Sequence, residues 1–146
     1  MKILLEKVIT KHEYVLLKNT QDDFDIFFDI VPKQMDEQNK YAVGMRMIFV
    51  QKNGSNQQND ANQQQNPEIT PDIDYLLEGQ FTIIKNDNDD IDFEKVMRVN
   101  CCSILFPFLR ERIARIFSDA GYFKPFYLPS KNFVEAYRLW KERTNQ

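Results

Sequence analysis

The stretch of sequence that decides the fold is residues 101–133, CCSILFPFLRERIARIFSDAGYFKPFYLPSKNF. With the residues before it, this stretch predicts a long helix over residues 92–120 that ends at Gly121. Pro107 removes a backbone donor, and we expect it to kink the helix or to start a new segment. Apolar residues extend well round the helix, which favours contact with another subunit besides the chain's own core. The main apolar stripe is expected to comprise Phe93, Met97, Ile104, Phe108, Ile113, Ile116 and Phe117.

The segment that follows this helix is too apolar for an ordinary solvated loop. Residues 122–131, YFKPFYLPSK, contain four aromatic residues and two prolines. Such a segment either packs as a lid on the core or lines a binding groove. A shorter helix is expected to begin at Asn132, because Glu135 follows three residues later, as in a capping box.

Four strands are expected before the long helix, over residues 3–17, 24–31, 41–51 and 74–85, the first as one long strand or two short ones. In the second strand, Asp25 and Asp29 alternate with apolar residues, so their face meets water and Phe27 is exposed beside them. Pro32 is expected to end that strand.

Two details of the later strands stay open at this point. Met45 and Met47 alternate with Gly44, Arg46 and Ile48 in the third strand and could be core filler or an adaptable binding surface. In the fourth strand, Gly79 favours a bulge. The face predicted for that strand comprises Tyr75, Leu77, Phe81 and Ile83.

The chain has the size of one domain, residues 1–146, and we expect its Asn/Gln-rich stretch 53–67 to be a disordered loop. Its twelve phenylalanines fit either a phenylalanine-rich core or a partly exposed aromatic groove. A net charge of −3 gives no general attraction to nucleic acid or to anionic lipid.

The residues needed for common catalytic and metal sites are missing from the sequence. His12 is the single histidine, the adjacent Cys101 and Cys102 are expected to be reduced thiols, and the four glycines are scattered. We therefore expect no enzyme activity, no metal and no cofactor. Glu6 and Lys7 interrupt the apolar start of the chain, and no run reaches membrane-spanning length, so a soluble, cytoplasmic protein is expected.

Two runs of residues resemble a known family. CSILFPFLRE, residues 102–111, looks like the SecB helix pattern N-I-L-F-P-Y-A-R-E, and residues 120–133 resemble that family's G-x-F-P-x-L-x-L-x-P-x-N-F. The resemblance implies an α+β fold, in which a four-stranded antiparallel sheet packs with the long helix and a shorter C-terminal helix. It also implies a homotetramer built as a dimer of dimers, and an ATP-independent chaperone that holds unfolded precursor polypeptides for protein export.

The same resemblance implies roles for particular residues. The client-binding groove would comprise Phe24, Phe27, Tyr122, Phe123, Phe126 and Tyr127. The oligomer interface would comprise Cys101, Ile104, Leu105 and Phe108. Leu76 and Glu78 are candidate contacts with the motor SecA, but His12 and Leu16 stand where this family has acidic residues in the first strand.

Three functions follow from the resemblance. The first is a general export holdase. The second is a dedicated chaperone for one partner, such as an antitoxin or a component of a specialised apparatus, and the weakened acidic surface favours it. The third is an adaptor or structural subunit with a closed groove and no holdase activity.

Overall fold

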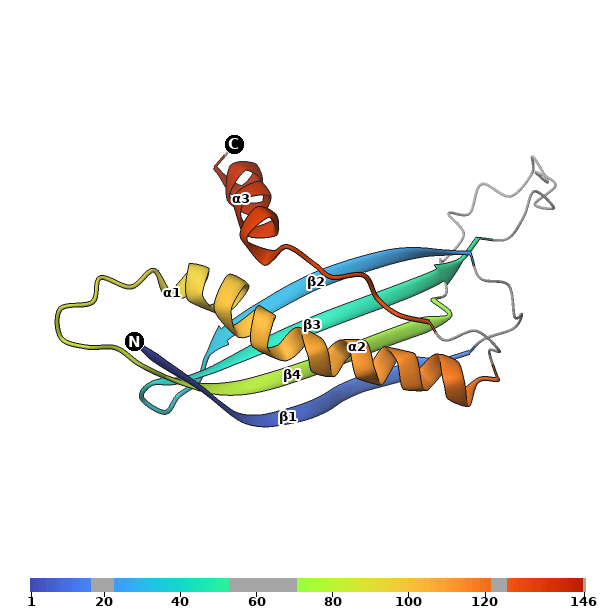
Figure 1. Cartoon of the computed structure of the whole chain (residues 1–146), viewed down its shortest axis with the longest axis horizontal. Helices are drawn as coiled ribbons and strands as arrows, with labels where there is room; N and C mark the ends of the chain where they lie inside the picture. Colours follow the sequence, from blue (N-terminus) through green and yellow to red (C-terminus); the bar gives the residue numbers. More distant parts are fainter. Residues whose placement is uncertain (17–22, 53–70, 122–125, 146) are drawn as a thin grey trace.

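The computed structural model describes residues 1–16, 23–52, 71–121 and 126–145 and has the predicted α+β architecture (Figure 1). The expected loop 53–67 lies outside the described residues. The elements in chain order are β1 Lys2–Val15, β2 Phe24–Gln34, β3 Lys40–Gln51, β4 Ile73–Ile84, α1 Phe93–Lys95, η1 Val96–Cys101, α2 Cys102–Asp119 and α3 Phe133–Thr144. The element η1 is a π-helical segment that joins α1 to α2.

The four strands form one antiparallel sheet in the order β1-β4-β3-β2. The strands β1 and β2 are therefore the two edges. The helix α2 lies across one face of the sheet, and we call the other face the open face (Figure 1).

The core lies between α2 and the inner strands. Alternate residues of β3 and β4 are buried toward α2, because successive side chains of a strand point to opposite faces. Tyr75, Leu77, Phe81 and Ile83 share that face, as predicted. Both Met45 and Met47 are buried there, so these methionines fill the core.

Two predicted details of the strands were wrong. Pro32 does not end β2, which continues to Gln34. An edge strand tolerates proline where its missing N–H would face away from the sheet, and β2 is such an edge. The sheet has no bulge at Gly79; its register shifts lie in β1, between Leu5 and Lys7 and between Thr10 and His12.

The predicted apolar stripe was correct at its two ends and wrong in the middle. Leu105 and Leu109 are 0% exposed, whereas Ile104 and Phe108 are 37% and 42% exposed. The π-helical turn of η1 explains the change, since it takes up an extra residue and moves the buried positions one residue along the sequence. The helix then continues through Pro107 as one element and starts no new segment.

Gly79 allows α2 to approach the sheet closely. A Cβ at this position would lie 2.7 Å from Phe81 Cε2 and 3.0 Å from Leu105 Cδ1. Both atoms belong to fully buried side chains, which have little room to move away.

We predict that Gly79→Ala lowers the free energy of unfolding by about 1–3 kcal/mol, because the added methyl overpacks the contact between sheet and helix. Urea unfolding followed by circular dichroism measures this change. Gly44→Ala is the matched control, since its Cβ would meet Leu76 at 3.3 Å on the open face. Equal stability of Gly79→Ala and the wild type would contradict the close-approach argument.

Candidate functional site

An aromatic cluster packs where β2 begins. The Phe117 and Phe126 rings stack with centroids 4.3 Å apart, and Phe24 lies edge-on to Phe117 at 5.5 Å. Phe49 contacts all three rings from the sheet. The cluster joins the edge strand, the inner sheet, the end of α2 and the segment that leads to α3.

The described part of the segment that leads to α3 packs partly on the core and is partly exposed. Leu128 is buried and Phe126 packs on the core, so part of the segment covers it. Tyr127 is 69% exposed and turns toward solvent. The predicted groove residues Tyr122 and Phe123 lie outside the described residues.

The structure separates one predicted groove residue from the others. Phe27 is 56% exposed and belongs to the open face, because it alternates along β2 with Phe24 and Phe28. Phe24 and Phe126 meet in the aromatic cluster on the helix side. Phe27 therefore does not share one surface with Phe24 and Phe126.

A cleft of about 460 Å³ lies farther along the same strand, between β2 and α3. Phe28 and Ile30 line it from β2, and Leu139 and Trp140 line it from α3. Apolar walls with a few charged groups are typical of ligand sites of this size. No local pattern in the sequence predicts this cleft, because the position of α3 depends on contacts between residues far apart in the chain.

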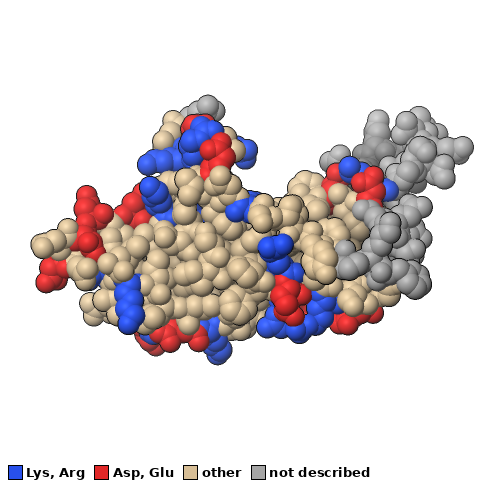
Figure 2. Space-filling view, in the orientation of Figure 1, with Lys and Arg blue, Asp and Glu red and all other residues tan. Residues whose placement is uncertain are grey.

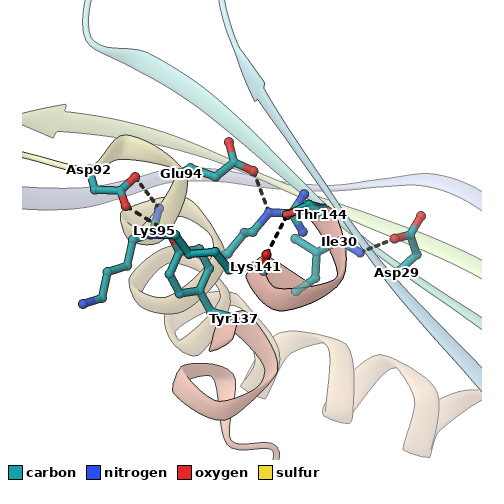
Figure 3. A network of polar contacts seen from close by, with 9 residues as sticks. Asp29, Ile30, Asp92, Glu94, Lys95, Tyr137, Lys141 and Thr144 are labelled. Carbon is teal, nitrogen blue, oxygen red and sulfur yellow. Dashed lines mark hydrogen bonds and ion pairs between the residues drawn. The ribbon is translucent and has the colours of Figure 1, made fainter. Parts of the chain in front are cut away.

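Polar contacts fix α3 as a wall of this cleft (Figure 3). The Tyr137 hydroxyl donates to Asp92 Oδ2 at 3.0 Å, and Asp92 Oδ1 caps α1 by accepting from the backbone N–H of Lys95. These two hydrogen bonds lower the pKa of Asp92, and the one from the Lys95 backbone has the larger effect. The Arg98 guanidinium lies 3.8 Å from the centroid of the Trp140 ring and donates to Glu94.

The edge of β2 beside the cleft has few free backbone donors. Ile30 and Pro32 have the same orientation in the strand, with their backbone nitrogens facing away from β3. Pro32 has no N–H, and the N–H of Ile30 donates to Asp29 Oδ1 at 3.0 Å. Such capping blocks the addition of another strand at these positions.

The open face carries the predicted motor-contact residues, Leu76 and Glu78, among mixed charges. Arg46 donates two hydrogen bonds to Asp74, at 2.9 and 2.7 Å, and this contact lowers the pKa of Asp74. Nε2 of His12 lies 3.6 Å from the same carboxylate, and Lys11 lies 4.0 Å from Glu78. The acidic groups of this face are thus largely paired with basic ones.

The outward side of α2 has an uncharged centre. Ser103, Ile104, Pro107 and Phe108 are exposed there, and we call these four residues the α2 patch. Figure 2 shows this side of the molecule, with most charged side chains around its rim. Cys101 and Leu105, predicted with Ile104 and Phe108 as interface residues, are fully buried in the chain's own core. Of the four predicted interface residues, Ile104 and Phe108 are the exposed ones.

The described residues contain no group of three or more His, Cys, Asp or Glu side chains placed to hold a metal ion. In that same part of the chain, no helix is long and apolar enough to cross a membrane. Burial raises the pKa of the Cys101 and Cys102 thiols to about 12, so neither is a nucleophile at neutral pH.

The comparison with protein families matches residues 9–144 to one model, "Preprotein translocase subunit SecB". The chain belongs to the SecB family. SecB proteins are chaperones and not enzymes, so the chain has a chaperone role without catalysis, as the sequence predicted.

Among solved structures, the SecB-like chaperone Rv1957 of Mycobacterium tuberculosis, in complex with a ChAD peptide from the antitoxin HigA1 (Rv1956), has a similar fold. The TM-score is 0.62 at 10% identity, covering 87% of this chain and 86% of that one. A Streptococcus agalactiae protein of unknown function gives a TM-score of 0.41 at 11% identity, covering 89% and 98%. The comparison with curated proteins gave no match.

We predict that Arg46→Leu lowers the free energy of unfolding by about 1–3 kcal/mol at pH 7, because it leaves the buried Asp74 carboxylate without its main partner. The lowered pKa of Asp74 means that the pair stabilises the fold above the unfolded-state pKa, near 3.9, and that this contribution is lost as pH falls through the folded-state value. The difference in the free energy of unfolding between the wild type and Arg46→Leu should therefore be smaller at pH 3 than at pH 7.

Urea unfolding at both pH values measures this effect. Lys52→Leu is the control, because Lys52 pairs with Asp23 and Asp25 at the surface and its loss should cost less than about 1 kcal/mol. If the difference in the free energy of unfolding between wild type and Arg46→Leu is the same at both pH values, the Asp74 carboxylate is not its source.

Proposed function

We propose that the protein is an ATP-independent holdase that binds unfolded or extended polypeptides on the helix side of β2. The observation that carries this proposal is the arrangement of the aromatic cluster and the cleft along one edge strand. Apolar surface of this kind binds extended segments through buried area and demands little sequence specificity.

Tyr127, Phe24 and Phe126 are the proposed client contacts in the aromatic cluster. Phe24 and Phe126 are partly buried and form its base, while Tyr127 projects from it. Tyr122 and Phe123 stay in the proposed set on the family resemblance. Several such weak sites bind one long chain together through effective concentration.

We further propose a homotetramer in the cytoplasm, with the α2 patch at a subunit interface. Ile104 and Phe108 are large apolar residues that the described chain leaves exposed. Burying them against another subunit removes apolar area from water, which stabilises an assembly.

Protein export is the first biological role we propose for this holdase, with Leu76 and Glu78 as motor contacts. A dedicated role for one partner is the second candidate, and the open face favours it. Asp74 is bonded to Arg46, and His12 lies beside it, so this face presents little free acidic charge. The solved complex of Rv1957 with an antitoxin peptide supports this candidate by fold similarity alone.

Aggregation of a reduced, unfolded client, followed by light scattering without ATP, tests the holdase proposal. We expect the protein to keep the client soluble. Tyr127→Asp should weaken client binding by about five- to thirtyfold, because it replaces an exposed aromatic contact with a charge. If the wild-type protein does not reduce client aggregation, the holdase proposal is wrong and the adaptor role with a closed groove is favoured.

Phe27→Asp is the matched control, since Phe27 is similarly exposed but lies on the open face. It should bind the client like the wild type. An equal loss in Phe27→Asp and Tyr127→Asp would mean that the client also occupies the open face, as the family resemblance implied for Phe27.

We predict that Ile104→Glu converts the tetramer to dimers, because a carboxylate in the α2 patch would have to be desolvated in the interface. Multi-angle light scattering measures the mass of each assembly. Val134→Glu, an exposed change on α3, should leave the tetramer intact. A tetramer that persists in Ile104→Glu would exclude the α2 patch as its interface.

A further inference from the structure

The cleft between β2 and α3 has cations without acidic partners. The Lys131 ammonium lies 3.6 Å from the centroid of the Phe28 ring, and Arg143 lines the cleft from the last turn of α3. Within the part of the chain that the structure describes, no carboxylate lies within ion-pair distance of either residue. Burial lowers the pKa of Lys131, as expected for an ammonium partly removed from water.

The acidic residues that line the same cleft already have partners. Glu135 accepts two hydrogen bonds from Arg138, at 3.0 and 2.6 Å. Asp29 accepts the N–H of Ile30 and lies opposite Arg46 across the β2–β3 ladder. The third cation, Arg98, is bonded to Glu94 and stacked on Trp140. Among the cations that line the cleft, Lys131 and Arg143 are therefore the two without a carboxylate partner among the described residues.

The backbone of β2 offers little to an extended segment at this point. The N–H of Ile30 is already bonded and Pro32 has none, so a client cannot continue a full strand ladder past Phe28. A client in the cleft is therefore held mainly through its side chains, and side chains supply sequence preference where backbone pairing does not.

We propose that this cleft binds client segments in which apolar side chains are flanked by carboxylates. The apolar residues contact Phe28, Ile30 and Leu139, and a Glu, Asp or chain-terminal carboxylate pairs with Lys131 and Arg143. This inference rests on the proposed holdase function and names the class of client sequence that the cleft between β2 and α3 selects.

Three short peptides test this inference. They share the same apolar residues, lack tryptophan and carry Glu, Gln or Lys at the same two positions. Trp140 is the single tryptophan of the chain and lines the cleft, so its fluorescence reports occupancy there directly. We expect the Glu peptide to bind about fivefold more tightly than the Gln peptide and the Lys peptide to bind most weakly. Added salt should remove most of this preference.

The double variant Lys131→Met, Arg143→Gln should lose the preference while still binding the Gln peptide, since methionine retains the packing on Phe28. Lys85→Gln with Arg115→Gln removes the same charge outside the cleft and should keep the preference. Equal binding of the three peptides by the wild type, or tighter binding of the Lys peptide, would overturn the inference and leave the holdase function standing. Failure to bind any peptide, together with unsuppressed client aggregation, would overturn both.

Discussion

The close contact between α2 and the sheet at Gly79 is the constraint on which the rest of the structure depends. Leu105 occupies the space that a side chain at residue 79 would take, so the helix lies near the sheet and buries its inner side completely. This position of α2 brings Phe117 onto Phe49 and fixes where the chain leaves the helix. Phe126 then stacks on Phe117, and the segment beyond it leads α3 toward the β2 edge.

The strands and helices could be predicted from local patterns in the sequence, whereas their arrangement as an antiparallel sheet packed with the long helix was implied by the resemblance to SecB proteins. Strand alternation gave the faces of β3 and β4, and Asn132 was correctly placed as the N-cap of α3. The π-helical turn could not be predicted, because one extra residue in a helical turn leaves no recognisable signal in the composition of the sequence. The same limit applies to Pro32, whose effect depends on whether its strand is an inner or an edge strand, and that is a property of the whole sheet.

The proposed binding surface was predicted only in part, because it depends on contacts between residues far apart in the chain. Phe24 and Phe126 could be grouped from the family resemblance, and the structure brings them together through Phe49 and Phe117. The cleft under α3 depends instead on Asp92 meeting Tyr137 and on Arg98 meeting Trp140, pairs separated by more than forty residues. Such pairings follow from the docked helix and have no pattern along the chain that would identify them in advance.

The burial of both cysteines has a practical consequence for following clients on this chaperone. Cys101 and Cys102 are the only cysteines of the chain, both are 0% exposed, and their thiols stay protonated at the pH at which maleimide reagents are used. A cysteine introduced at an exposed position can therefore carry a fluorophore selectively on an otherwise unaltered chain. The native protein is thus already suited to single-site labelling and to distance measurements between chaperone and client.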